Sequence, residues 1–227
     1  MTELENERIE PLVELVDVSM RSDRGESVFR DLTLDLLPGR SVVITGSSGS
    51  GKTMLGELLI GLRIPQSGKI RLFGHDLSRR KRSVVRRVRL QIGGVGGQFR
   101  LVPSLTVAQN ISLPMVIAGE RKKIRQERLR KMLAEFSLLR QAGEYPGSLT
   151  RVENTLVLLA RASVANQPLM IIDEPLAGLD QKTFSRVADF LAKVSISGRS
   201  MIILASDPLP VQLPNSEQRQ IVNGALV

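Results

Sequence analysis

The 227-residue sequence predicts an α/β fold with a mixed sheet, and three features of its hydrophobic pattern predict it. Two segments near the N-terminus alternate apolar and polar residues, which is typical of half-buried antiparallel strands. Short continuous apolar runs follow, as expected for strands buried on both faces. Between two of these runs the apolar positions of residues 106–165 follow a helical period, which predicts an inserted α-helical portion.

The first part of the chain predicts an N-terminal antiparallel β portion followed by alternating strands and helices. The expected strands are Leu12–Val18, Leu32–Leu36, Ser41–Ile44 and Lys69–Phe73, and the expected helices are Met54–Leu62 and Ser83–Leu90. The segment Ile92–Gln98 contains four glycines and is predicted to be a flexible hinge instead of a regular element.

The second part of the chain predicts two or three helices and then a return to the sheet. The expected elements after the helical block are strands at Leu169–Ile172, Met201–Ala205 and Gln218–Val222, with a helix at Gln181–Ser195 and a turn at Asn223-Gly224. We therefore predict one domain over 1–227, with an α/β core at 1–103 and 166–227 and a helical subdomain at 104–165.

Composition limits the classes of protein that need to be considered. The absence of cysteine excludes disulfide scaffolds and cysteine-based metal or redox sites. The stretch Met1–Glu7 is acidic and lacks an apolar core, so we expect no signal peptide there. No apolar run approaches the length that crosses a bilayer, so membrane contact is expected to be indirect, through a partner or the surface.

The net charge of +9 is concentrated in two segments. Residues 79–89 and 121–131 hold fourteen of the 32 lysines and arginines with a single acid, so the remainder carries 18 minus 22, or −4. Solvated helix faces are the first interpretation, docking to a membrane protein or anionic lipid the second, and nucleic acid the third. One tyrosine, six phenylalanines and no tryptophan supply a poor surface for base stacking, so we expect no nucleic-acid partner.

A glycine-rich loop lies between the apolar run Val42–Ile44 and the expected first helix. Its residues are Gly46, Ser47, Ser48, Gly49, Ser50, Gly51, Lys52 and Thr53. The pattern GxxxxGK[ST] between a strand and a helix predicts a phosphate-binding loop. Glycines let the backbone amides turn inward around a phosphate, Lys52 adds a positive charge, and Thr53 offers a hydroxyl to Mg²⁺.

A second motif, Asp173-Glu174, ends the apolar run Leu169–Ile172. A buried strand that ends in two acids can bring Asp173 to Mg²⁺ and leave Glu174 to orient or deprotonate an attacking water. Paired with the loop about 120 residues upstream, the motif predicts an ATPase with a phosphate-loop (RecA-like) core. A GTPase is disfavoured because the chain contains no Asn-Lys-x-Asp motif.

At this point the chain resembles the ATP-binding subunits of ABC transporters over nearly its whole length. The resemblance rests on Gly46–Thr53, Leu101–Val107, Asn110–Pro114, Leu159–Ala162, Ile171–Pro175 and Gly178–Asp180. The phrase Leu-Thr-Val-x-x-Asn-Ile-x-Leu-Pro looks most like the lipoprotein-release and cell-division branch.

The resemblance implies an energy-coupling subunit that binds ATP and Mg²⁺ and drives a transmembrane permease. It also implies pairing with a second ATP-binding subunit, as a homodimer or heterodimer that sandwiches two ATP molecules, with Asp180 at the dimer seam. The implied location is the cytoplasm, peripheral on the cytoplasmic face of the inner (plasma) membrane.

Three features of the family pattern are altered in this chain. The signature loop, usually Leu-Ser-Gly-Gly-Gln, aligns with Leu149–Glu153, where Thr150 keeps a hydroxyl but arginine and valine replace both glycines. Side chains there are expected to hold a partner subunit away or to change how it closes. The switch histidine is Ser206, which carries no positive charge, and no aromatic residue falls near Ser22, where one usually stacks on adenine.

The hinge glutamine of the family has two candidate positions in this chain. Straight alignment puts Gly97 there, whereas a shift of one residue makes it Gln98, which would bind at the nucleotide and link it to the membrane partner.

These features leave three hypotheses. The first is an ATP-binding, energy-coupling subunit that binds MgATP through the loop and Thr150, and hydrolyses it slowly with Lys52 and Glu174 as catalytic residues. The alternative is a non-hydrolysing regulatory module or the degenerate partner of a heterodimer. The third is a basic DNA-associated ATPase, which would explain residues 79–89 and 121–131 but lacks long coiled-coil arms.

Overall fold

The computed structural model describes residues 10–79, 81–174, 176, 178–209 and 212–227. Its strands are β1 (Val13–Arg21), β2 (Ser27–Leu36), β3 (Ser41–Thr45), β4 (Ser67–Leu72), β5 (His75–Asp76), β6 (Ile92–Val95), β7 (Leu169–Asp173), β8 (Ser200–Ala205), β9 (Ser216–Val222) and β10 (Ala225–Leu226). Its helices are α1 (Lys52–Leu59), α2 (Arg82–Leu90), α3 (Val107–Ile117), α4 (Lys122–Glu135), the 3-10 turn η1 (Pro146–Ser148), α5 (Arg151–Ser163) and α6 (Gln181–Ile196). The prediction for Met1–Glu7 falls outside the described residues, as do Arg80 and Pro175 of the predicted motifs.

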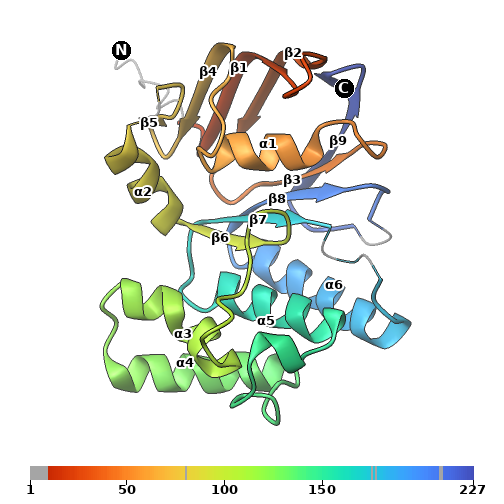
Figure 1. The fold of residues 1–227 in the computed structure, drawn as a ribbon. Helices are drawn as coiled ribbons and strands as arrows, with labels where there is room; N and C mark the ends of the chain where they lie inside the picture. The colour runs from red at the N-terminus through yellow and green to blue at the C-terminus, as the bar shows by residue number, and fades with distance from the viewer. Residues whose placement is uncertain (1–9, 80, 175, 177, 210–211) are drawn as a thin grey trace, which may run out of the picture.

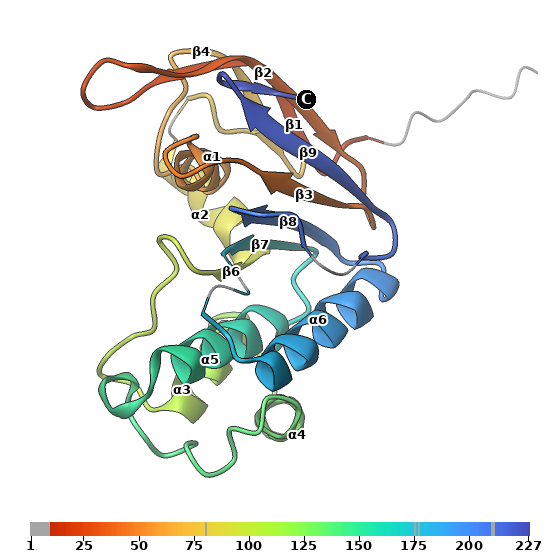
Figure 2. The same ribbon diagram turned by 90° about the vertical axis from the view of Figure 1, so that its right-hand side faces the viewer.

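The described strands form two sheets with helices between and beneath them, which confirms the predicted α/β class with an N-terminal antiparallel portion. The antiparallel sheet has the order β2-β1-β4-β5, and the second sheet has the mixed order β10-β9-β3-β8-β7-β6. Figure 2 shows the layers edge on, with α1 between the two sheets, α5 and α6 beneath the second sheet, and α4 farthest from it.

The second sheet separates two hydrophobic clusters, because its central strands are buried on both faces. In β3, Val42 and Ile44 contribute to the cluster around α1, whereas Val43 contributes to the cluster with the helices below. The strands β7 and β8 alternate in the same way. Their carboxyl ends are thereby fixed at one edge of the sheet, where α/β proteins bind ligands.

Most predicted elements are confirmed within a few residues. The predicted pair around the turn at Asp23 is the β1–β2 hairpin, with Val13 opposite Leu36. The predicted first helix ends earlier than expected, at Leu59, because Gly61 turns the chain with a φ of 64°.

The prediction that Ile92–Gln98 contains no regular element is wrong, because Ile92–Val95 forms the buried strand β6, parallel to β7. Its glycines are required by close packing: a Cβ on Gly93 would lie 2.1 Å from the carbonyl oxygen of Ala162, and one on Gly94 would lie 2.1 Å from the ring of Phe99. The glycines therefore admit α5 and an aromatic ring against the strand.

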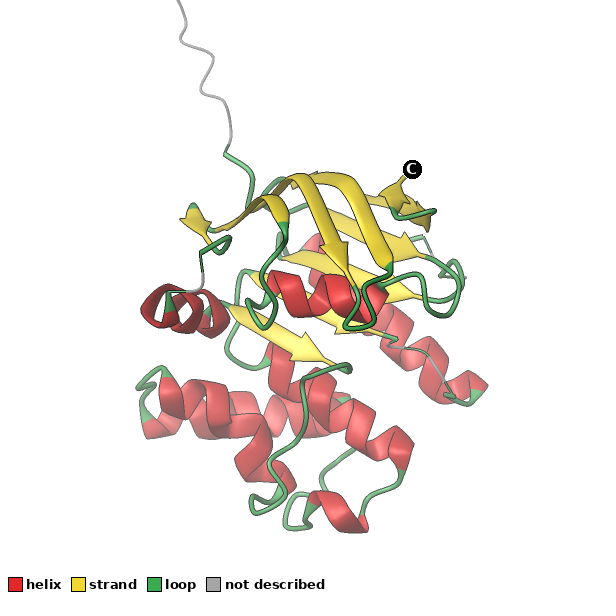
Figure 3. Ribbon diagram, turned by 45° about the horizontal axis from the view of Figure 1, so that its top comes forward, coloured by secondary structure: helices red, strands yellow, loops and turns green. Residues whose placement is uncertain are grey.

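The segment predicted as a helical subdomain, 104–165, contains α3, α4, η1 and α5, which lie together below the sheets (Figure 3). These helices share the lower hydrophobic cluster with the sheet, and the proposed boundaries at 104 and 165 stay a prediction. Both basic segments coincide with helices, α2 and α4, whose cationic side chains lie mostly exposed. Among the described residues, no helix is long and apolar enough to cross a membrane.

Candidate functional site

The glycine-rich loop connects the end of β3 to the start of α1, as predicted. Lys52 begins α1, and its side chain is buried with Nζ donating to the carbonyl oxygens of Gly46 at 2.7 Å and Ser47 at 3.1 Å. A buried ammonium that is held by its own loop is a fixed positive charge. The helix N-terminus beside it has no side-chain cap and no acidic residue in its first turn, so it remains available to an anion.

Close packing explains two of the loop glycines. A Cβ on Gly46 would lie 2.5 Å from Oγ of Ser50. Gly51 has a φ of 100°, and a Cβ there would lie 2.5 Å from Val28 and 2.8 Å from Phe29. Oγ of Ser50 is buried without a hydrogen-bond partner among the described residues. A narrow loop with an unsatisfied hydroxyl, a fixed ammonium and an uncapped helix fits a phosphate group.

The outer part of the loop, Ser47, Ser48 and Gly49, is exposed and lines a hollow of about 810 Å³. The opposite walls are the β1–β2 hairpin at 26–30 and the β9–β10 turn at 220–224. The described residues that line this hollow include no aromatic residue. The expected loss of base stacking stays a prediction. Ser22 is not among them; the hairpin presents Val28 and Arg30 to the loop instead.

Thr53 and Asp173 meet across the sheet edge. The strands β3 and β7 are separated by β8, and Thr53 Oγ1 donates to Asp173 Oδ2 at 3.2 Å. Burial raises the pKa of Asp173 above its ordinary value of 3.8, and the neighbouring charge of Glu174 raises it further, whereas Thr53 and Lys52 oppose the shift. The described residues contain no group of three or more acids or histidines that could hold a metal, so phosphate oxygens would have to complete a Mg²⁺ shell begun by Thr53 and Asp173.

Glu174 follows Asp173 in a left-handed conformation, with a φ of 54°. Its backbone N–H donates to the carbonyl oxygen of Leu204 at 2.8 Å, and its Oε1 accepts a hydrogen bond of 2.5 Å from Ser206. Ser206, at the predicted position of the switch histidine, therefore holds the predicted base directly, a contact that sequence reasoning missed. Left-handed backbone at a residue without glycine's freedom is a strained arrangement of the kind found at functional sites.

The two candidates for the hinge glutamine lie in different places. Gly97 lies against Asp173, where a Cβ would come within 2.8 Å of Oδ2. Gln98 instead donates from Nε2 to Glu57 of α1 at 2.7 Å, and Glu57 also pairs with Arg63. The structure therefore brings Gly97, and not Gln98, to the Thr53–Asp173 pair.

Thr150 is the N-cap of α5 and forms a capping box with Glu153. Its Oγ1 accepts from the N–H of Glu153 at 3.2 Å, and Glu153 Oε2 accepts from the N–H of Thr150 at 2.8 Å. The hydrogen bonds that the Glu153 carboxylate accepts from the N–H and the hydroxyl of Thr150 lower its pKa below the ordinary value of 4.5. Asp180, expected at a dimer seam, is exposed and caps α6 through the N–H groups of Lys182 and Thr183.

A pocket of about 380 Å³ joins the nucleotide-side motifs to α5. One wall contains Thr53, Asp173 and Glu174, and the facing wall contains Arg151 and Thr155. Sequence reasoning did not place Arg151 beside this chain's own acids. The sequence did contain a signal for this placement. The spacing i, i+4, i+7 puts Arg151, Thr155 and Leu158 on one face of the helix, and all three line the pocket.

Comparison with known proteins decides the family. The model of the ABC transporter family matches residues 29–177, which include the loop, β7 and α5. The chain belongs to the ABC transporter family. The ABC transporter ATP-binding protein YknY of Bacillus subtilis is 32% identical over 201 residues, covering 87% of both chains. The lipoprotein-releasing system ATP-binding protein LolD 1 of Rhodopirellula baltica is 30% identical over 204 residues, covering 88% of both.

Other relatives are longer than this chain. The macrolide export ATP-binding/permease protein MacB of Marinobacter nauticus is 31% identical over 221 residues, which is 96% of this chain but 34% of MacB. The chain thus spans about a third of the length of such relatives.

Solved ABC cassettes have the same fold. The dimeric structure of MJ0796, a bacterial ABC transporter cassette, matches with a TM-score of 0.85 at 25% identity, covering 94% of this chain and 96% of that one. A second MJ0796 dimer, in a post-hydrolysis state bound to ADP and Pi, matches with a TM-score of 0.84. These neighbours confirm the predicted family and fold class.

Proposed function

We propose that this chain is the ATP-binding, energy-coupling subunit of an ABC-type membrane transport complex, which binds MgATP and hydrolyses it slowly. The observation that carries the proposal is the assembly of a phosphate-binding loop with the Thr53–Asp173 contact at one sheet edge. The MJ0796 dimer bound to ADP and Pi supports it, since its fold is the same over 94% of this chain.

The residues present suit MgATP. Lys52, the uncapped N-terminus of α1 and the Ser50 hydroxyl would hold the phosphates, and Gly46–Gly51 would wrap the chain of phosphates. Thr53 and Asp173 would hold Mg²⁺, which supplies charge neutralisation on the terminal phosphates. Thr150 and Gln98 take part less directly, because each side chain already has an internal partner.

Glu174 is the residue proposed to orient or deprotonate water. Its carboxylate lines the same pocket as Thr53 and Asp173 and is held there by Ser206. Slow turnover is expected because Ser206 supplies a hydroxyl and no positive charge at the position of the switch histidine. The side chains of Arg151 and Val152 would also obstruct the close approach of a partner's phosphates.

A permease is the proposed membrane partner. MacB is an ATP-binding/permease protein, and LolD 1 is the ATP-binding protein of a lipoprotein-releasing system. An apolar groove of about 470 Å³, between α2, β6, α3 and α5, supports a docking role. Its lining includes Leu90, which is 51% exposed, and Ile117, which is 56% exposed. A second cassette would complete a homodimer or heterodimer, peripheral on the cytoplasmic face of the membrane.

The second candidate is a module that binds ATP without hydrolysis, either as a regulator or as the degenerate half of a heterodimer. The capping box of α5 favours it, because Glu153 brings negative charge to the helix terminus that a partner's phosphates would approach.

ATP turnover by the full chain distinguishes the two candidates. An energy-coupling ATPase is expected to show slow turnover that falls by about tenfold or more in Glu174→Gln, with ATP binding retained. Glu135→Gln, a change of a half-buried acid on α4 that pairs with Lys193, is the matched control and should leave turnover unchanged. Turnover that is indistinguishable between the wild type and Glu174→Gln would favour the non-hydrolysing module, and a rate typical of ordinary transport ATPases would contradict slow hydrolysis.

A further inference from the structure

The helix α2 presents a row of arginines to solvent. Arg82, Arg86 and Arg89 follow the spacing i, i+4, i+7, so they share one helix face, and all three line a hollow of about 510 Å³. The helix contains no acidic residue. Arg82 and Arg86 are exposed, and neither takes part in an ion pair within the described part of the chain. The hollow therefore carries positive charge that no such pair neutralises.

The helix that carries these arginines is held firmly against the core. Arg89 Nε donates to the carbonyl oxygen of Ile60, just after α1, at 2.7 Å. Val85 and Val88 are buried under the helix. Because Arg89 and the two valines anchor α2, Arg82 and Arg86 project from a fixed element and form part of a defined surface.

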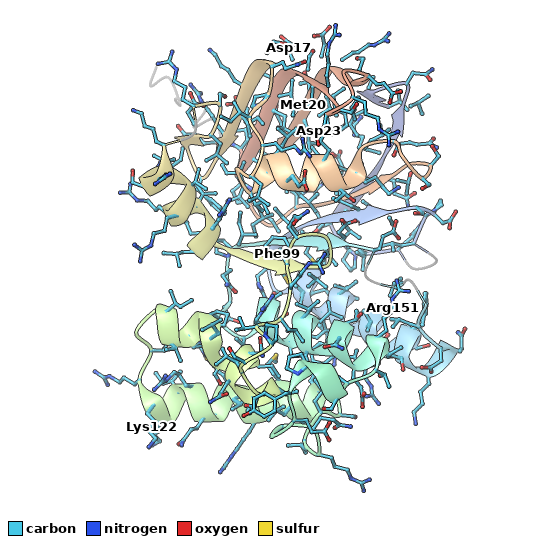
Figure 4. All side chains as sticks on the ribbon, in the orientation of Figure 1. Asp17, Met20, Asp23, Phe99, Lys122 and Arg151 are labelled. Carbon is cyan, nitrogen blue, oxygen red and sulfur yellow. The ribbon has the colours of Figure 1, made fainter. Side chains whose placement is uncertain are left out.

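A second basic group lies at the start of α4. Lys122 and Lys123 are exposed and belong to none of the ion pairs among the described residues. Figures 1 and 3 show α2 and the start of α4 at the same side of the molecule, where Figure 4 labels Lys122. We call Arg82, Arg86, Lys122 and Lys123 the basic rim. The nearby acids are already paired: Glu120 with Arg128, Glu127 with Lys131 and Glu135 with Lys193.

Exposed aliphatic side chains lie between the two halves of the basic rim. Leu90 is 51% exposed and Ile117 is 56% exposed, and both line the groove between α2 and α3. Cations beside exposed aliphatic groups are typical of surfaces that lie at the level of lipid headgroups, where anionic headgroups bind the charge and the acyl boundary accepts the apolar groups. Nucleic acid would use the charge alone, and the described residues that line the α2 hollow offer no aromatic ring to a base.

We propose that the basic rim binds anionic phospholipids, so that this chain contacts a membrane surface directly, in addition to any protein partner. A continuous anionic surface can meet α2 and the start of α4 at once, on both sides of the groove. The inference goes beyond the proposed function, because the basic rim lies outside the loop Gly46–Thr53 and needs no bound nucleotide.

Sedimentation of the full chain with lipid vesicles tests the inference. The wild type should bind vesicles made of equal parts of phosphatidylglycerol and phosphatidylcholine, and should not bind phosphatidylcholine alone. Arg82→Gln combined with Arg86→Gln should weaken binding by about twentyfold, because each arginine near an anionic surface contributes about fivefold. Lys122→Gln combined with Lys123→Gln should weaken binding by a similar factor.

The matched control removes two positive charges elsewhere. Arg40 and Arg140 are exposed and lie outside α2 and α4. Arg40→Gln combined with Arg140→Gln should bind the anionic vesicles as the wild type does. Urea unfolding should give the same midpoint for all three double variants, since each changes only exposed side chains.

The contrary outcomes are specific. A wild type that does not bind the anionic vesicles, or a loss as large in the control as in the rim variants, would overturn the inference. A loss in only one of the two rim variants would overturn a surface that spans both helices. If duplex DNA bound the wild type as tightly as the vesicles at the same salt, and the rim variants lost it, the assignment to lipid would be wrong.

Nucleotide titration separates this inference from the proposed function. Both rim variants should bind MgATP as the wild type does, because the basic rim does not include the loop. A wild type that binds anionic vesicles but no nucleotide would contradict the proposed function and leave the inference standing. The reverse result would contradict the inference and leave the proposed function standing.

Discussion

The N-termini of α1 and α5 are built in opposite ways. The helix α1 follows Gly51, has no side-chain cap and carries no acid in its first turn. The helix α5 follows Thr150, has a complete capping box and carries Glu153 in its first turn. The first N–H groups of both helices have no partner within the helix, but only those of α1 remain available to an external anion. Phosphate binding at a helix N-terminus therefore depends on the absence of a capping side chain and of a nearby acid, as well as on the free amide groups.

The largest expected effect comes from removing the charge at the start of α1. Lys52→Ala should weaken binding of MgATP by about a hundredfold or more, because the fixed ammonium beside the phosphates is lost. Nucleotide titration of the full chain measures the change. Lys122→Ala, at the exposed start of α4, is the control and should bind normally; Figure 4 labels Lys122 far from Arg151. If Lys52→Ala bound MgATP within twofold of the wild type, the start of α1 would not be the phosphate-binding terminus.

The glycine before α1 can be tested against a second glycine of the same loop. Gly51→Ala should lower the free energy of unfolding by about 2 to 4 kcal/mol, since a left-handed backbone conformation and a collision with Val28 both oppose a Cβ. Gly49 also has a positive φ, 83°, but an added Cβ there would meet open space. Gly49→Ala should therefore lower the free energy of unfolding only by the backbone strain, about 1 to 2 kcal/mol. Urea unfolding measures both changes; equal losses would mean that the collision is relieved by movement of the hairpin.

On α5, the cap contributes to stability instead of ligand binding. Thr150→Ala should lower the free energy of unfolding by about 1 kcal/mol, because the N–H of Glu153 loses its acceptor. Ser185→Ala, which removes an exposed hydroxyl in the middle of α6, is the control and should have little effect. A Thr150→Ala variant as stable as the wild type but impaired in nucleotide binding would show instead that Thr150 acts on the nucleotide.

The smallest effect concerns the charge of Glu153. Glu153→Gln keeps a capping-box partner and removes the carboxylate, so at pH 7 it should be slightly less stable than the wild type. Because the folded state lowers the pKa of Glu153 from its ordinary value of 4.5, the stability it contributes is present above that value and is lost as pH falls through the folded pKa. The difference between the two proteins should therefore disappear in acid. A difference that persists at low pH would have to come from geometry and not from charge.

The sequence predicted the parts of the molecule that depend on local pattern. The loop Gly46–Thr53 and the strand ending at Asp173 carry their spacing in the chain, so their meeting at one sheet edge was foreseeable. The strand β6 was missed because glycine has low strand propensity. Glycine is required there because Ala162 and Phe99 pack closely against the strand, and this packing can be seen only in the folded chain.

Side-chain direction limited the prediction of the site. Gln98 was predicted to bind the nucleotide, but its side chain donates a hydrogen bond to Glu57 instead. Glu57 lies 41 residues earlier in the chain, so no local pattern in the sequence indicates this contact. The contact between Ser206 and Glu174 likewise joins two strand ends, 32 residues apart, whose rotamers no periodicity encodes. Residues that act through backbone position were therefore predicted better than residues that act through long side chains.

The contact between Gly93 and Ala162 also has a mechanical consequence. It pins α5 near its C-terminal end, eleven residues or about 16 Å from Arg151 at 1.5 Å per residue. If α5 rotated by about 10° around the Gly93–Ala162 contact, its N-terminal end, about 16 Å away, would move by about 3 Å. The position of Gly93 thus sets the length of helix over which a small tilt of α5 would widen or narrow the pocket lined by Arg151, Asp173 and Glu174.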